Sequence, residues 1–157
     1  MILLDGKSLS KKIKLELSNE IKKIISKDRR NPHLVAILVG SNPASKTYVS
    51  AKERACNEIG FDSTIIQFKE DVSQEDLIKK IHQINKDPNI DGLIVQLPLP
   101  AHIDEFSVTN SISENKDVDG FHPVSLGKMM LGVPCFLPAT PFGIMTLIEE
   151  YKIEVSG

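Results

Sequence analysis

Two short apolar runs constrain the fold of this 157-residue chain more than any other feature. The first, Leu34–Val39, contains only apolar residues and is ended by Gly40, and the second, Gly92–Gln96, is apolar up to its last residue. Runs of this kind are typical of strands that are covered on both faces. A third segment, Thr64–Phe68, reads as a strand as well. The sequence therefore predicts a mainly parallel sheet packed between helices.

Segments with helical periodicity alternate with these strands. The expected helices run from Ser8 or Ser10 to about Lys27, from Asn42-Pro43 to Gly60, and from Ser73 to about Asn85, before Asp87-Pro88. The apolar stripes of the first and third are Ile13, Leu17, Ile21, Ile24 and Ile25, and Leu77, Ile78, Ile81 and Ile84. Ile2–Leu4 is a further, short strand candidate.

This alternation of strands and helices predicts an α/β fold, a three-layer α/β/α domain with a mainly parallel sheet built from βαβ units. Ligands of such sheets bind outside the carboxyl ends of the strands. The start of the second helix and the residues from Gln96 onward both lie at that edge. We therefore expect the functional site there.

Composition and charge exclude several classes of protein. The chain is 41% hydrophobic and 25% charged, as in an ordinary globular protein. Residues 1–30 hold nine Lys and Arg against four Asp and Glu, which reads either as a solvated helix face or as an anion-binding helix. Aromatic residues are not interleaved with the basic ones, so no nucleic-acid partner is expected. No segment is long enough for a membrane span or a signal peptide, so the expected location is the cytoplasm.

No metal site is expected either. Cys56 and Cys135 are too far apart in sequence for a zinc-binding spacing. Asn115–Gly120 starts like a calcium-binding loop, but the twelfth position is Leu126, where a bidentate Glu is required.

A near-match to a phosphate-binding P-loop is left as an alternative. Gly40–Thr47 follows a strand and opens a helix, which is the right context for such a loop. Ser45 replaces the second glycine of the pattern, and Pro43 removes one backbone N–H from the cradle. The third strand also ends in Gln96 and not in an Asp that would hold magnesium. These departures weaken the P-loop interpretation.

Tyr48 and Lys52 lie four residues apart on the expected second helix and therefore share a face. The rest of that face is apolar, with Ala44, Ala55 and Ile59, so the lysine interrupts a stripe that should be buried. Such a lysine either extends its amine to water or stands desolvated in a pocket, where it can transfer protons. The pattern alone leaves both interpretations open.

Two further segments carry polar groups at the ligand-binding edge of the sheet. In Val95–Pro100, Gln96 ends a buried strand and two prolines make the exit rigid. Its amide is either a satisfied strand terminator or a partner for a lysine or a polar ligand. Asp117 and Asp119 stand in a turn ended by Gly120, and a plain Asx-turn is the alternative to a ligand-binding function.

Together these motifs resemble a known enzyme family over the whole chain. The matching segments are Tyr48-Val-Ser-Ala-Lys52, Val95-Gln-Leu-Pro-Leu-Pro100, Lys116-Asp-Val-Asp-Gly120 and Pro138-Ala-Thr-Pro-Phe-Gly143, with Asp5-Gly6-Lys7 and Leu38–Ser45 in addition. Their order and spacing are similar to those of the N-terminal half of the bifunctional methylenetetrahydrofolate dehydrogenase/methenyltetrahydrofolate cyclohydrolase family.

The resemblance implies an enzyme of one-carbon metabolism. It would oxidise 5,10-methylenetetrahydrofolate with NADP and hydrolyse the methenyl product to 10-formyltetrahydrofolate in one folate pocket. The family's general acid/base falls on Lys52, its ring-stacking aromatic residue on Tyr48 and the glutamine that holds the lysine on Gln96. The carboxylate that binds the pterin's amino edge falls on Asp119. The implied substrate-binding residues are Tyr48, Val49, Ser50, Ala51, Lys52, Val95, Gln96, Leu97, Pro98 and Asp119.

The same resemblance divides the chain into a folate-binding catalytic domain, residues 1–137, and a connecting helix, residues 138–157, with Ile144, Leu147 and Ile148 as its apolar stripe. In the family this helix leads into a Rossmann domain that binds NADP, and the sequence contains no G-x-G-x-x-G turn. We therefore expect only the folate half of a cytoplasmic homodimeric enzyme in this chain, with NADP against NAD left open. A folate-binding module without catalysis remains the other alternative.

Overall fold

In the computed structural model, which describes residues 3–27 and 29–155, six helices and three strands follow one another along the chain. Their bounds are α1 Gly6–Ile25, β1 His33–Val39, α2 Pro43–Ile59, β2 Asp62–Phe68, α3 Gln74–Lys86, β3 Gly92–Val95, α4 Glu105–Ser111, α5 Pro123–Met130 and α6 Ala139–Glu150. The strands and the helices α1, α2 and α3 match the predicted segments. Helix α6 starts where the connecting helix of residues 138–157 was expected but ends at Glu150, and the short helices α4 and α5 were not predicted.

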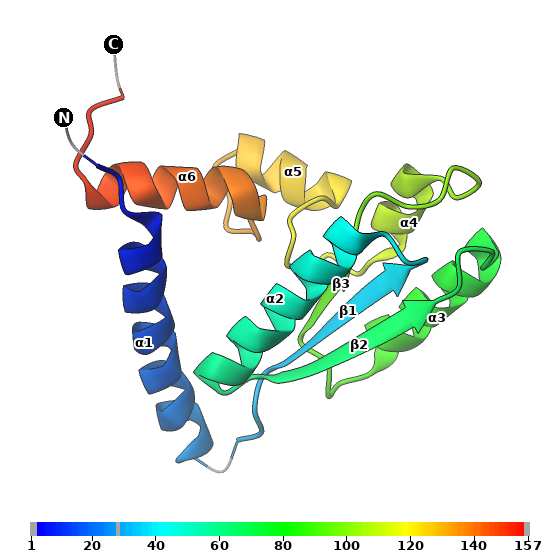
Figure 1. Cartoon of the computed structure of the whole chain (residues 1–157), viewed down its shortest axis with the longest axis horizontal. Helices are drawn as coiled ribbons and strands as arrows, with labels where there is room; N and C mark the ends of the chain where they lie inside the picture. The colour runs from blue at the N-terminus through cyan, green and yellow to red at the C-terminus, as the bar shows by residue number, and fades with distance from the viewer. Residues whose placement is uncertain (1–2, 28, 156–157) are drawn as a thin grey trace.

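The sheet is parallel and has the strand order β2-β1-β3 (Figure 1). In the central strand β1, Val35 lies opposite Thr64 of β2 and Leu93 of β3. Helix α2 covers one face of the sheet, and α3 and α4 cover the other. This arrangement confirms the predicted three-layer α/β/α fold, and all three strands end at the same edge, as the crossover connections of parallel strands require.

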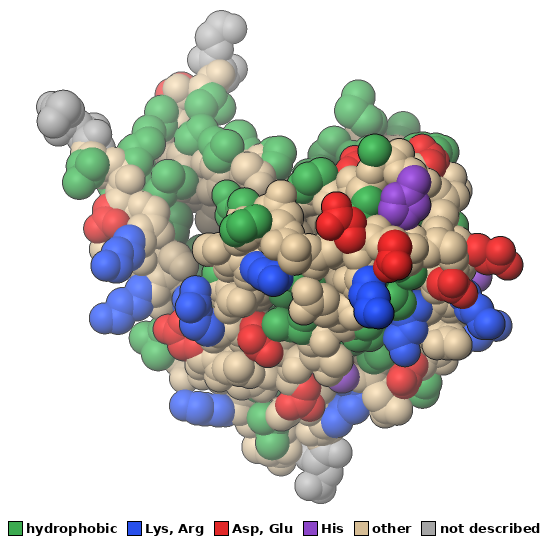
Figure 2. Space-filling model, turned by 45° about the vertical axis from the view of Figure 1, so that its right-hand side comes forward, with side chains coloured by type: hydrophobic (Ala, Val, Ile, Leu, Met, Phe, Trp, Pro, Cys, Tyr) green, Lys and Arg blue, Asp and Glu red, His purple; other side chains and the backbone are tan. Residues whose placement is uncertain are grey.

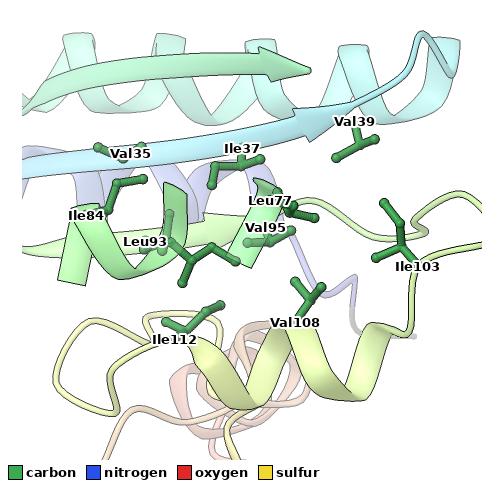
Figure 3. Packing of buried hydrophobic residues seen from close by; sticks show 11 residues of the cluster. Val35, Ile37, Val39, Leu77, Ile84, Leu93, Val95, Ile103, Val108 and Ile112 are labelled. Carbon is green, nitrogen blue, oxygen red and sulfur yellow. The ribbon is translucent and has the colours of Figure 1, made fainter. Parts of the chain in front are cut away.

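Alternate residues of β1 point to the two faces of the sheet, as the pleat of a strand requires. Val35, Ile37 and Val39 pack toward α3 and α4 (Figure 3), whereas Ala36 and Leu38 pack toward α2. The larger core cluster also contains Leu77, Ile81, Ile84, Leu93, Val95, Ile103, Val108 and Ile112. Burial on both faces explains why the sequence of β1 is apolar throughout.

Two expectations about the N-terminal segment are wrong. Helix α1 is capped by Asp5, whose Oδ1 accepts hydrogen bonds from the N–H groups of Lys7 and Ser8 at 3.0 Å, so neither Ser8 nor Ser10 is the cap. Asp5 is as good an N-cap residue as serine and stands directly before the helical periodicity. The expected strand Ile2–Leu4 is not formed by Leu3 and Leu4, while Ile2 lies outside the described residues.

The signals that bound α2 and α3 are confirmed. Asn42 caps α2, and Gly60 ends it in the left-handed conformation with φ +94°. Ser73 caps α3, of which Leu77, Ile81 and Ile84 are buried. On α1, in contrast, Ile21 is the buried member of the predicted stripe, and Ile25 is exposed.

The start of α1 lies next to the end of α6 at the left of Figure 1, and the two helices run in different directions from there. Lys12 forms a salt bridge with Glu150 at 2.8 Å, and the Tyr151 hydroxyl accepts a hydrogen bond from the Asp5 N–H at 2.9 Å. Between them is an apolar groove of about 630 Å³, which Phe136 and Phe142 help to line. No residue of α6 is buried, and Figure 2 shows hydrophobic side chains exposed at the upper left of the molecule.

None of the described helices combines the length and the apolar character that crossing a lipid bilayer demands.

Arg30 ties the segment before β1 to the start of β3. Its Nη1 and Nη2 donate to Oδ2 and Oδ1 of Asp91 at 2.6 and 2.9 Å, and the His33 N–H donates to Oδ2 at 2.8 Å. These contacts, that of Arg30 foremost, lower the pKa of Asp91 below its ordinary value. Because the pair is largely exposed, its contribution to stability is modest.

We expect Asp91→Asn to destabilise the chain at pH 7 and to do so less and less toward pH 3. A carboxylate whose pKa is lowered by folding contributes stability above its unfolded pKa of about 3.9, and this stability is lost as the pH falls through the folded pKa. Denaturant unfolding across this pH range measures the effect, with the exposed Asp71→Asn as control. A stability difference independent of pH would contradict this assignment.

Candidate active site

A lysine and an aspartate from distant parts of the chain meet where α2 faces the loop that runs beside β3. Nζ of Lys52, on α2, lies 3.5 Å from Oδ2 of Asp119, in the loop between α4 and α5. The side chain of Lys52 is 33% exposed and that of Asp119 is 18% exposed. The amine and the carboxylate are therefore partly withdrawn from solvent but still accessible to a ligand.

The buried face of α2 differs from the predicted one in part. Its buried residues are Ser45, Val49, Cys56 and Ile59. Their spacing places Lys52 in the same line on the helix, so this lysine does interrupt the buried stripe, as predicted. Ala44 and Tyr48 were assigned to that stripe wrongly, because both are exposed. The buried stripe therefore starts one residue later than predicted, with Ser45 and Val49 in place of Ala44 and Tyr48.

Tyr48 stands one helical turn before Lys52, with 64% of its surface exposed. An exposed aromatic side chain at the edge of a site offers a flat apolar face for stacking. Cys56, one turn after Lys52, is buried, and this burial raises the pKa of its thiol. A thiol in such a place is a core group and not a nucleophile.

Gln96 follows directly on β3 and carries an unusual amide. Its Nε2 donates to the Leu97 carbonyl oxygen at 2.7 Å, and its backbone N–H donates to Ile37 at 2.9 Å. Its Oε1 is buried and has no hydrogen-bond partner among the described residues. Buried polar atoms are rarely left unpaired in folded proteins. The buried end of the Gln96 side chain therefore holds an unused acceptor directly after β3.

The loop that carries Asp119 is fixed to the body of the protein. The Leu93 N–H donates to the Lys116 carbonyl oxygen at 2.8 Å, so that Asp117 pairs with β3 in an isolated bridge. The Lys116 ammonium donates to the carbonyl oxygens of Ile84 and Asp87 at 2.7 and 2.6 Å. The turn around Asp119 therefore rests on both β3 and the end of α3.

The remaining predicted substrate-binding residues lie in different surroundings. Val49 and Val95 are buried in the core, so their side chains do not face the site. Ser50, Ala51 and Pro98 are exposed, and Leu97 is half-buried. Val49 and Val95 therefore offer no side chain to a ligand at the Lys52–Asp119 pair.

The start of α2 does not form a phosphate cradle. Oδ1 of Asn42 already accepts hydrogen bonds from the N–H groups of Ala44 and Ser45, at 2.9 and 3.2 Å, and Pro43 has no N–H. Glu70 also lines the adjoining pocket, where its negative charge would repel a phosphate. Both features disfavour the P-loop alternative. Within residues 3–27 and 29–155, no group of three or more His, Cys, Asp or Glu is placed to hold a metal ion.

Comparisons with known proteins agree with these observations. Residues 4–119 match the sequence profile described as tetrahydrofolate dehydrogenase/cyclohydrolase, catalytic domain. The bifunctional protein FolD of Cytophaga hutchinsonii is 54% identical over 157 residues, which cover 100% of this chain and 54% of that protein. The protein of the same name from Bacteroides thetaiotaomicron is 48% identical, again over 100% of this chain and 54% of its own length. The chain thus spans about half the length of the curated relatives it matches.

Solved structures give the same result. The bifunctional enzyme FolD-methylenetetrahydrofolate dehydrogenase/cyclohydrolase from Campylobacter jejuni superposes with a TM-score of 0.96 at 46% identity, covering 100% of this chain and 56% of that one. The Trypanosoma brucei FolD, solved with NADP cofactor and inhibitor, has a TM-score of 0.95 at 30% identity and covers 99% and 54%.

The profile match, the identity to FolD proteins over the whole of this chain and the contact between the motif residues Lys52 and Asp119 have a single explanation. This chain belongs to the tetrahydrofolate dehydrogenase/cyclohydrolase family.

Proposed function

We propose that this chain supplies the folate-binding and proton-transfer half of a bifunctional enzyme. That enzyme oxidises 5,10-methylenetetrahydrofolate with NADP and hydrolyses the methenyl product to 10-formyltetrahydrofolate. The observation that carries the proposal is the 3.5 Å approach of the Lys52 amine to the Asp119 carboxylate. We assign residues 1–137 to the folate-binding domain and residues 138–157 to the connecting segment, in which the helix α6 spans Ala139–Glu150.

Recognition of the pterin is assigned to Tyr48 and Asp119. A pterin is flat, and the exposed ring of Tyr48 offers an apolar face of matching shape. The aminopyrimidine edge of the pterin presents N–H donors, which the two oxygens of the Asp119 carboxylate can accept together. Both side chains border Lys52, so a pterin held by them would bring its one-carbon group near the lysine amine.

Lys52 is assigned to proton transfer during hydrolysis. The oxygen of water forms a bond to the methenyl carbon, and the Lys52 amine accepts the proton that water gives up. The bond from this carbon to N5 then breaks with its electron pair remaining on N5, which takes up a proton. The second proton of water is released as the formyl C=O forms. One water is thereby added to the methenyl cation and one proton is released.

Gln96 is assigned to orienting the lysine. Its unpaired Oε1 is an acceptor for an ammonium group. A lysine that is held by an amide oxygen keeps its amine in one place without the extra negative charge of a second carboxylate, and proton transfer depends on such placement.

The residues of this chain do not fit a dinucleotide. The N–H groups at the start of α2 are occupied by the Asn42 cap, and the sequence contains no G-x-G-x-x-G turn. NADP belongs to the complete enzyme, for which a cytoplasmic homodimer is part of the proposal.

A hybrid protein tests the assignment. Residues 1–157 are joined to the C-terminal half of the Cytophaga hutchinsonii relative, and NADP reduction with methylenetetrahydrofolate and hydrolysis of the methenyl compound are both measured. We expect both activities in the hybrid, and folate binding with no NADP reduction in the 157-residue chain alone. A folded hybrid that binds folate but catalyses neither reaction would favour the alternative of a binding module without catalysis.

We expect Asp119→Asn to weaken folate binding more than it slows the chemistry of bound substrate. Hydrogen bonds to a charged group contribute about 1.5–3 kcal/mol, so the KM should rise by roughly 10- to 100-fold. An amide keeps one acceptor of the two and adds a donor that faces the pterin's own donors. KM and kcat of the hybrid measure this split, with the exposed Asp71→Asn as the control. A large fall in kcat at unchanged KM would overturn the assignment.

A further inference from the structure

We propose that Asp117 is a positioning residue, which sets the direction of the Asp119 carboxylate, and this proposal rests on the proposed function. Asp117 is the buried carboxylate of the loop, with 1% of its surface exposed. Asp117 takes no part in the proposed pterin recognition or in the proposed hydrolysis. Its charge makes no salt bridge with any residue that the structure describes. A carboxylate buried in this way needs strong hydrogen bonds to remain in place.

Backbone N–H groups supply those hydrogen bonds. Oδ1 of Asp117 accepts from the Phe121 N–H at 3.2 Å, and Oδ2 accepts from the His122 N–H at 2.9 Å. The Gly120 N–H also donates to the Asp117 carbonyl oxygen at 3.1 Å. Asp117, two residues before Asp119, is thus hydrogen-bonded to the three residues that follow Asp119, and these bonds close a ring of the chain. The Asp119 backbone lies inside this ring and has little freedom to turn.

The ring is built on a fixed base. The Leu93 N–H bonds to the Lys116 carbonyl oxygen, which joins the start of the ring to β3. The His122 side chain caps α5 by accepting a hydrogen bond from the Val124 N–H at 3.1 Å, which joins the end of the ring to that helix. The carboxylate of Asp117 therefore fixes the turn of residues 117–122, and this turn directs Asp119 toward Lys52.

The geometry requires a carboxylate because two donors point at two acceptors. In Asp117→Asn, one oxygen becomes an NH₂ group that faces a backbone N–H, so one hydrogen bond is replaced by a repulsive contact. We expect the turn to open on that side. Asp119 would then lose its direction although its own side chain is unchanged.

A double-mutant cycle distinguishes this function from a general effect on stability. Binding of a folate analogue to the hybrid protein is measured for Asp117→Asn, Asp119→Asn and the double variant. We expect Asp117→Asn to weaken binding by about 10-fold alone and by less than about 2-fold in the Asp119→Asn background. Equal losses in both backgrounds, or no loss in either, would overturn the proposal. Val108→Ala, a core substitution on α4, is the control for destabilisation and should leave the affinity unchanged.

Amide hydrogen exchange tests the positioning independently of folate. In Asp117→Asn, the Phe121 and His122 amides should exchange at least about 10-fold faster, while the Leu93 amide stays protected. Unchanged exchange of Phe121 and His122 would contradict the proposal even if folate binding were lost. Failure of the unsubstituted hybrid to bind folate would instead count against the proposed function. The amide exchange rates alone would then decide whether Asp117 holds the turn in place. If Asp117→Asn does not fold, Asp117→Ser is used, for which the same outcomes are expected.

Discussion

Replacing Lys52 by Met should abolish hydrolysis of 5,10-methenyltetrahydrofolate by the hybrid enzyme, with a fall of about 10²- to 10⁴-fold in kcat. Methionine fills the space of the lysine's aliphatic chain and cannot transfer a proton. The Lys52 side chain is 33% exposed, and its contact with Asp119 is 3.5 Å long, so removal of the amine should change stability little. The fold and the folate affinity are expected to persist while the reaction stops.

Hydrolysis of the methenyl compound, folate-analogue binding and thermal unfolding are measured together for this variant. Lys46→Met is the matched control, because Lys46 is an exposed lysine on the first turns of the same helix. Its activity should stay near that of the unsubstituted hybrid. Near-normal hydrolysis by Lys52→Met would show that another group transfers the proton, and a collapse of folate binding would point to a binding function of the amine instead.

Much of the fold follows from local sequence signals. The apolar run that forms β1 is covered on both faces, and the caps Asn42 and Ser73 begin α2 and α3 where predicted. These signals are local because a cap or a buried strand is defined by a few neighbouring residues. The short helices α4 and α5 were missed, since each has two turns or so and too few residues for a periodic pattern.

The sequence named the residues of the candidate site but not their arrangement in space. The turn motif identified Asp119, yet its approach to Lys52 joins residues 67 positions apart and depends on the packing of the whole loop. The exposure of Tyr48 was likewise misjudged, because the apolar face of α2 is wide and the sheet selects which part of it is buried. A sequence pattern gives the face of a helix to within about one residue, and the tertiary contacts decide the rest.

Asp117 illustrates a different limit. Its place beside Asp119 was visible in the sequence, but an aspartate in a turn is usually a surface residue with a local hydrogen bond. Only the structure gives its burial and its two backbone donors. The Gly120 that ends the turn is constrained in a similar way, by close backbone neighbours that only the structure shows.

Gly120→Ala should destabilise the chain and weaken folate binding, whereas Gly132→Ala should do neither to a comparable extent. Both glycines have positive φ, +69° and +68°, so alanine is strained equally at the two positions. A Cβ on Gly120 would lie 2.6 Å from the backbone atoms C of Leu137 and N of Pro138, whereas a Cβ on Gly132 would meet nothing within 4 Å. The difference between the variants therefore isolates this collision from the conformational cost.

The collision cannot be relieved by a rotamer change, because the atoms that a Cβ would meet are backbone atoms. Overpacking of this kind costs about 1–3 kcal/mol beyond the left-handed strain that both variants share. The turn must move away from the segment before α6, and Asp119, the preceding residue, moves with it. Denaturant unfolding and folate-analogue binding of the two variants measure the effects. If Gly120→Ala matched Gly132→Ala in both, the contact between this turn and residues 137–138 would not hold Asp119 in place.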